Sequence, residues 1–156
     1  MGIAEALEKD YLRLEQQLMG VGDAMPAEHY GFKPTIDVRS FGEQLRHVAA
    51  VQWFIGAALM NREPPVDVGD GDSGPTSMTG KAEILAYVAA SFAYLREAIR
   101  GMSNDDALET IPHPFDSQIT MERMTIVGGY ASHGWEHYGQ MVVYLRLNEV
   151  VPPSSR

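Results

Sequence analysis

Four stretches of this sequence repeat apolar residues at intervals of three and four, and this repeat restricts the fold more than any other feature. Such spacing places apolar side chains on one stripe of an α-helix, and the stripe must be buried against other helices. The first stripe contains Leu7, Tyr11, Leu14 and Leu18. The second contains Phe41, Leu45, Val48, Ile55 and Leu59, with the polar Gln52 at one position of the same spacing. The third contains Ile84, Leu85, Val88, Phe92, Leu95 and Ile99. A fourth helix is expected from about 120 to 147.

Local signals mark several ends of these helices. Ser40 followed three residues later by Glu43 forms a capping box, so Ser40 is the predicted N-cap of the second helix. The Pro-Pro pair at 64–65 ends that helix. The third helix is expected over about 80–100, with Gly101 as the residue after its C-terminus.

The segments between the predicted helices contain many turn-forming residues. Positions 61–78 are rich in Gly, Pro and Asp and lack the spacing of a calcium-binding loop, so they predict a long surface crossover. Positions 103–118 contain two prolines and are expected to form a loop. No segment alternates apolar and polar residues as a half-buried strand does. The chain is therefore expected to be all-α: a four-helix bundle of one domain, 1–156, with a long crossover between helices two and three.

The charge balance excludes whole classes of partner. Twelve Lys and Arg residues face 21 Asp and Glu residues, which gives a formal net charge of −9. Proteins that grip nucleic acid or anionic lipid need clustered basic side chains, so neither partner is expected. The longest apolar stretch, 48–60, is too short to span a bilayer, and no secretion signal is apparent. With no cysteine in the sequence, we expect a cytoplasmic protein without a thiolate nucleophile of its own.

Three of the five histidines form a candidate metal site. His133 and His137 are four residues apart on one predicted helix. Their side chains therefore share a face of the helix, with Cβ atoms about 5–6 Å apart. Two imidazoles rarely hold an ion alone, and a third ligand must come from another helix. His47, in the middle of the second helix, is the candidate. The alternatives are that the pair lies on a plain helix surface and that His47 is an ordinary core residue.

The other two histidines, His29 and His113, fall in expected loops and are predicted to be solvated rather than ligands. Four glycines in the last helix need a separate explanation, because each costs about 1 kcal/mol relative to alanine in a helix interior. Close helix approach, room for a bound group or a dimer seam would each explain them. They are Gly128, Gly129, Gly134 and Gly139.

The segment from His133 to His137 also matches His-x-x-Glu-His, an inverted zinc-peptidase pattern in which the glutamate is the general base. That class needs a third ligand well downstream, and the only carboxylate after His137 is Glu149. A peptidase is therefore disfavoured. Glu136 remains the one candidate catalytic residue, although it lies about 100° around the helix from His137 and is expected to face solvent.

Helical geometry also predicts which side chains lie within a turn or two of the three histidines and could line a pocket. For the aromatic and methionine side chains core packing is the usual role, whereas the two glutamines could orient ligands. The candidates are Gln44, Val51, Phe54, Tyr130, Gln140, Met141 and Tyr144.

These motifs together resemble the DinB/YfiT-like family of metal-binding four-helix bundles, and the likeness extends over nearly the whole chain. Asn148-Glu149 departs from the family pattern, in which glycine often follows the arginine. The segments that carry the resemblance are Ser40–Ala49, His133–Gln140, Tyr144–Arg146 and Val151–Pro153.

The resemblance implies an up-down-down-up bundle, often a homodimer, with zinc or nickel as the expected ion at His47, His133 and His137. It leaves activity open. A metal-dependent S-transferase would use a low-molecular-weight thiol, such as bacillithiol or mycothiol, as the nucleophile that the chain lacks. A hydrolase would use the ion to lower the pKa of bound water. A third alternative is a non-catalytic metal- and ligand-binding stress protein.

Overall fold

The computed structural model describes residues 1–156 and is mostly helical. Its helices are α1 (Ile3–Ala24), α2 (Phe41–Leu59), α3 (Lys81–Arg100), α4 (Asn104–Leu108) and α5 (Arg123–Leu147). Two strands, β1 (Thr110–His113) and β2 (Asp116–Glu122), and two short 3-10 turns, η1 (Ala27–His29) and η2 (Pro153–Ser155), complete the chain. No helix is both long enough and apolar enough to cross a membrane.

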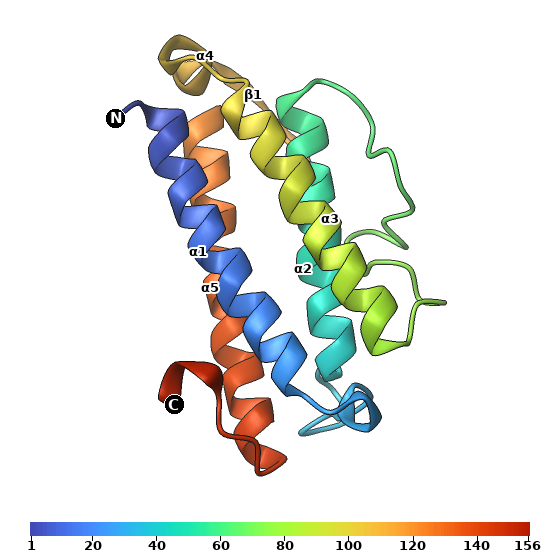
Figure 1. Ribbon diagram of the computed structural model, residues 1–156. Coiled ribbons are helices and arrows are strands. Elements are labelled where there is room, and N and C mark those ends of the chain that lie inside the picture. The colour runs from blue at the N-terminus through green and yellow to red at the C-terminus, as the bar shows by residue number, and fades with distance from the viewer.

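The four long helices lie side by side around a common core. In Figure 1, α1 and α5 run downward, whereas α2 and α3 run upward. The helix α2 packs against α3 and α5, and α1 packs against the same two helices. The contact between α2 and α5 positions the candidate metal centre, because α2 carries one of its histidines and α5 carries the other two.

The predicted apolar stripes form this core. Tyr11, Leu14 and Leu18 of α1 are completely buried, as are Phe41 of α2 and Phe92 of α3. The predicted capping box is also present. The Glu43 amide donates to Ser40 Oγ at 3.3 Å, and the Ser40 amide donates to Glu43 Oε2 at 2.6 Å. These contacts fix where α2 begins, and so fix the height of its side chains along the bundle.

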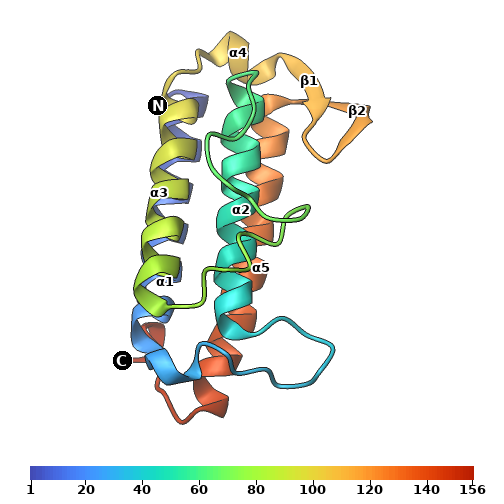
Figure 2. The same ribbon diagram turned by 90° about the vertical axis from the view of Figure 1, so that its right-hand side faces the viewer.

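The crossover from the end of α2 to the start of α3 runs back along the outside of the helices, as Figure 2 shows. It occupies positions 60–80 and contains no helix or strand. Because α2 and α3 run in the same direction, the chain must return almost the length of a helix before α3 can begin. The prediction of a long surface crossover is confirmed.

The expectation of an all-α chain was wrong in one region, because positions 103–118 are not a loop. Ser103 caps the short helix α4, and its Oγ accepts from the Asp106 amide at 3.1 Å. The strands β1 and β2 then form an antiparallel hairpin, in which Thr120 pairs with Pro112. As a consequence α5 begins at Arg123 rather than near position 120. The hairpin gave no alternating pattern because β2 is almost wholly exposed.

Candidate metal centre

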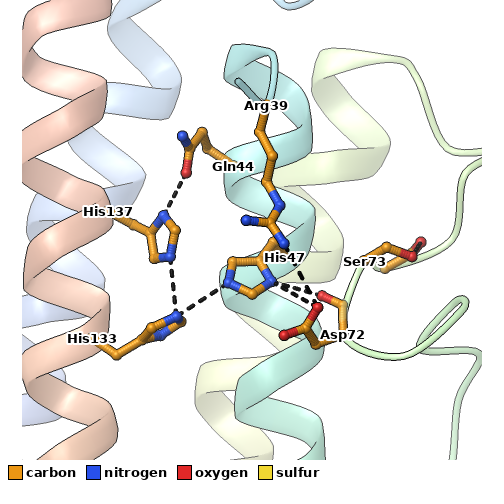
Figure 3. Close-up of polar contacts among 8 residues, drawn as sticks. Arg39, Gln44, His47, Asp72, Ser73, His133 and His137 are labelled. Atoms are coloured by element: carbon orange, nitrogen blue, oxygen red, sulfur yellow. Dashed lines mark hydrogen bonds and ion pairs between the residues drawn. The ribbon is translucent and has the colours of Figure 1, made fainter. Parts of the chain in front are cut away.

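Three histidines from two helices meet with the same ring nitrogen pointing inward. The Nε2 atom of His133 lies 3.1 Å from that of His47 and 3.0 Å from that of His137. Each ring offers one ligand atom, and these atoms all lie within 4.8 Å of one another. His47 and His137 are only 4% and 6% exposed. The structure therefore brings together the three side chains that the sequence nominated (Figure 3).

Helix packing places these rings. His133 and His137 share one face of α5, and Gly134 lies between them on the face toward α1. A Cβ atom on Gly134 would lie 2.5 Å from Leu14 Cδ2, so this glycine allows the close approach of α1 and α5. Gly128, Gly129 and Gly139 face open space. Close helix approach therefore explains only one of the four glycines.

The outer nitrogens of two rings are fixed by hydrogen bonds. His47 Nδ1 lies 2.8 Å from the backbone oxygen of Asp72, which can only accept, so Nδ1 carries the proton. His137 Nδ1 donates to Gln44 Oε1. The amide of Gln44 is oriented by its own Nε2, which donates to Gln140 Oε1 at 2.8 Å. Both Nε2 atoms are consequently left with lone pairs directed at His133.

This arrangement fits a cation better than it fits a hydrogen-bond network. One proton on His133 Nε2 could serve only one of the two neighbouring lone pairs, so one close contact between nitrogen atoms would have no proton. Two imidazole nitrogens bound to one zinc-like ion at about 2.0–2.1 Å lie roughly 3 Å apart, and both contacts of His133 Nε2 have this separation. Hydrogen bonds from the opposite nitrogens are the usual supports of such ligands.

Burial keeps these rings uncharged. Burial above all, with smaller effects of the neighbouring His133 and His47, lowers the pKa of His137 to about 3. Burial also lowers the pKa of His47, against the opposing effect of the Asp72 carbonyl, and the pKa of His133. All three rings are neutral at pH 7, the form that binds metal.

The predicted pocket residues divide into two groups. Gln44, Gln140 and Tyr144 form a polar network behind His137: Gln44 Nε2 lies 3.4 Å from Tyr144 Oη, which donates to the Arg39 carbonyl at 2.8 Å. The other group is apolar, and its buried members are part of the core. Those core residues are Val51 and Met141.

Partly exposed aromatic rings extend from His133 toward the hairpin. The ring of Tyr130 is centred 6.0 Å from that of His133 and 5.6 Å from that of Phe115, which in turn lies 5.3 Å from Phe54. Tyr130 Oη is 3.1 Å from His113 Nε2. Phe54 and Tyr130 were nominated from the sequence, whereas the two hairpin residues were not, because the hairpin itself was not predicted.

The remaining candidates lie outside the cluster. Glu136 is exposed and forms no hydrogen bond or ion pair. His29 bonds Asn148 through Nδ1, and His113 bonds Tyr130. Neither ring joins the inward-facing nitrogens.

The sequence reasoning missed Asp72 and Arg39. Asp72 Oδ1 lies 3.4 Å from His47 Nδ1 and 3.7 Å from the nearer Arg39 guanidinium nitrogen. The Gly- and Asp-rich composition of the crossover gave no sign of this contact, because the main hydrogen bond is made by a backbone carbonyl, which every residue type has.

The chain is similar to known proteins in sequence and in fold. The model of the DinB superfamily matches residues 11–141. A DinB-like protein from Bacillus subtilis has a similar fold, with a TM-score of 0.72, 12% identity and 92% of each chain covered. A conserved protein from Enterococcus faecalis has a TM-score of 0.76 and 16% identity, covering 94% of this chain and 97% of that one. No curated protein matches the sequence.

Proposed function

The chain belongs to the DinB superfamily, and we propose that it binds one divalent metal ion and uses it to transfer a low-molecular-weight thiol to an electrophile. The observation that carries the proposal is the set of three converging Nε2 atoms at His47, His133 and His137. Zinc and nickel both suit imidazole ligands. Three protein ligands leave coordination positions open, as catalytic sites require.

A thiol supplied from solution agrees with the composition of the chain. There is no cysteine, so a sulfur nucleophile must be imported. When bound, a divalent ion deprotonates a thiol that coordinates it. The role of the chain is to hold the three imidazoles neutral and oriented. The rings of Phe54, Phe115 and Tyr130 offer a partly exposed apolar surface beside His133, against which an electrophile would rest.

The proposed reaction is a substitution, in which no atom needs an external oxidant or reductant. The thiol sulfur forms a bond to the electrophilic carbon, and the leaving group departs with the electron pair of the bond that breaks. The thiol proton passes to solvent. Hydrolysis at the same site is less well supported, because the ion alone would have to activate the water, with no general base near the inward face of the histidines. Glu136 is exposed, and Asp72 contacts His47 at Nδ1, on the opposite side of the ring.

Thiol transfer is tested with monochlorobimane, whose chloride leaves as the fluorescent thioether forms. The protein is loaded with zinc or nickel, its metal content is measured by mass spectrometry, and it is mixed with bacillithiol, mycothiol, glutathione or cysteine. We expect at least one thiol to react faster than with the His137→Ala variant, and Glu136→Gln to leave that rate unchanged.

Two results would reject the transferase. No thiol reacting above the His137→Ala rate would exclude this activity, and thiol binding without product would favour a non-catalytic binding protein. A rate that falls with Glu136→Gln, measured on ester or amide substrates, would instead support hydrolysis. The homodimer and the cytoplasmic location stay predictions.

A further inference from the structure

We infer that the crossover between α2 and α3 is part of the metal centre, with Asp72 as a positioning residue that fixes the ring of His47. This inference rests on the proposed metal binding and adds a residue set that the histidine pattern does not contain. His137 is oriented by a side chain, Gln44, whereas His47 is oriented by the backbone of a loop. The ring of His47 is therefore fixed only if the loop itself is held in place.

The crossover is fastened to α2 directly beside His47. Arg46, the preceding residue, is 7% exposed. Its Nη1 atom donates to the carbonyls of Pro75 and Met78, each at 2.9 Å. One buried guanidinium thus holds two points of the loop against the helix, and the cost of leaving it without these partners keeps the loop in place.

Glycine allows the close approach. Gly74 has φ +72°, and a Cβ atom there would lie 2.8 Å from both the Cβ and the carbonyl oxygen of Arg46. An alanine at this position would be strained and would also push the loop away from α2. The Gly74 amide donates to the Val68 carbonyl at 2.9 Å, which closes the turn that presents Asp72.

The closed turn places Asp72 against the outer nitrogen of His47 (Figure 3). Its carbonyl accepts from Nδ1 at 2.8 Å, and its carboxylate oxygen Oδ1 lies 3.4 Å from the same atom. With the proton held at Nδ1, the lone pair of Nε2 faces His133 at 3.1 Å. Moving the loop would free the ring to rotate or to exchange its tautomer, and metal affinity would fall.

The test compares Gly74→Ala with Gly56→Ala. Gly56 lies in α2 but faces α3, where a Cβ atom would lie 2.7 Å from Tyr94 Cδ1. Both variants crowd α2, but only Gly74→Ala displaces the loop. We expect Gly74→Ala to weaken zinc binding about 10- to 100-fold in a competition titration, the usual effect of losing an orienting partner. Gly56→Ala should bind zinc within about threefold of wild type.

A spectroscopic measurement separates orientation from general damage. In ¹⁵N NMR spectra of the metal-free wild type, His47 should carry its proton on Nδ1, and in Gly74→Ala this preference should be lost while His137 keeps it. If Gly74→Ala fails to fold, the wild-type spectrum decides, since a proton on Nε2 of His47 would overturn the inference. Equal zinc affinity of the folded variant and wild type would overturn it too. Absence of zinc and nickel binding by wild type would instead reject the proposed function.

Discussion

Gln44 holds His137 by accepting a hydrogen bond from its Nδ1 atom, while the amide of the same glutamine donates to Gln140 Oε1 at 2.8 Å. The second bond decides which end of the Gln44 amide faces the histidine. Gln44, a residue of α2, therefore determines which ring nitrogen of His137 on α5 carries the proton, and this dependence can be measured.

Replacing Gln44 with leucine should weaken metal binding about 10- to 100-fold, because His137 would lose the acceptor that keeps its proton on Nδ1. Isothermal titration with zinc measures the change. Gln17→Leu is the matched control: it removes a 2.9 Å hydrogen bond from Tyr138 of α5 to Gln17 of α1, and neither residue bonds one of the three histidines. Equal losses in the two variants would show that Gln44 acts only through stability.

Alanine at any one of His47, His133 and His137 should abolish stoichiometric metal binding, since two imidazoles rarely retain an ion. Metal content after dialysis at pH 7 checks this. His29→Ala removes a histidine that bonds Asn148, outside the cluster, and should retain a full equivalent of metal. A single-alanine variant of the cluster that still carries one equivalent would contradict the proposed ligand set.

Metal binding should persist below the ordinary histidine pKa of about 6.5. Burial lowers the pKa of all three rings, that of His137 to about 3, so protons compete with the ion only at lower pH. Zinc titrations at pH 7, 6 and 5 should show little loss at pH 6. Affinity that is lost already between pH 7 and 6, in a protein still folded by circular dichroism, would contradict the neutral buried cluster.

The metal-free protein should become less stable as the pH falls from 7 to 5. Below about pH 6.5 the unfolded histidines take up protons that the folded ones do not, so acid favours the unfolded state. Denaturant unfolding at each pH measures the slope. His137→Ala should show a shallower slope, because it removes the histidine whose pKa is lowered most. An unchanged slope would show that His137 does not cause the loss of stability in acid.

Two glycines of α5 should respond to alanine in opposite directions. Gly129→Ala adds a methyl group in open space and should raise the free energy of unfolding by about 1 kcal/mol through helix propensity. Gly134→Ala crowds the fully buried Leu14, and an overpacking cost of about 1–3 kcal/mol should outweigh the same gain in helix propensity and leave this variant less stable than wild type. If Gly129 instead lies in a dimer seam, Gly129→Ala would shift the sedimentation of the protein toward monomer.

The pattern of residues was enough to predict the features that depend on local geometry. The apolar spacing around Tyr11 and Phe92 predicted buried helix faces, Ser40 and Glu43 predicted the start of α2, and the interval from His133 to His137 put both rings on one face. Each of these features depends on residues within a turn or two of one another, where helix geometry alone fixes the relation between side chains.

The contacts of the histidines, in contrast, depend on how distant segments pack together. That His47 faces His133 depends on how α2 and α5 are aligned, and that its ring is fixed depends on the path of the crossover to Asp72. The decisive contact there is made by a backbone carbonyl, which leaves no mark on residue identity. The hairpin that brings Phe115 toward Tyr130 was hidden for a related reason: its strands are exposed, so no buried face imposed an apolar pattern on the sequence.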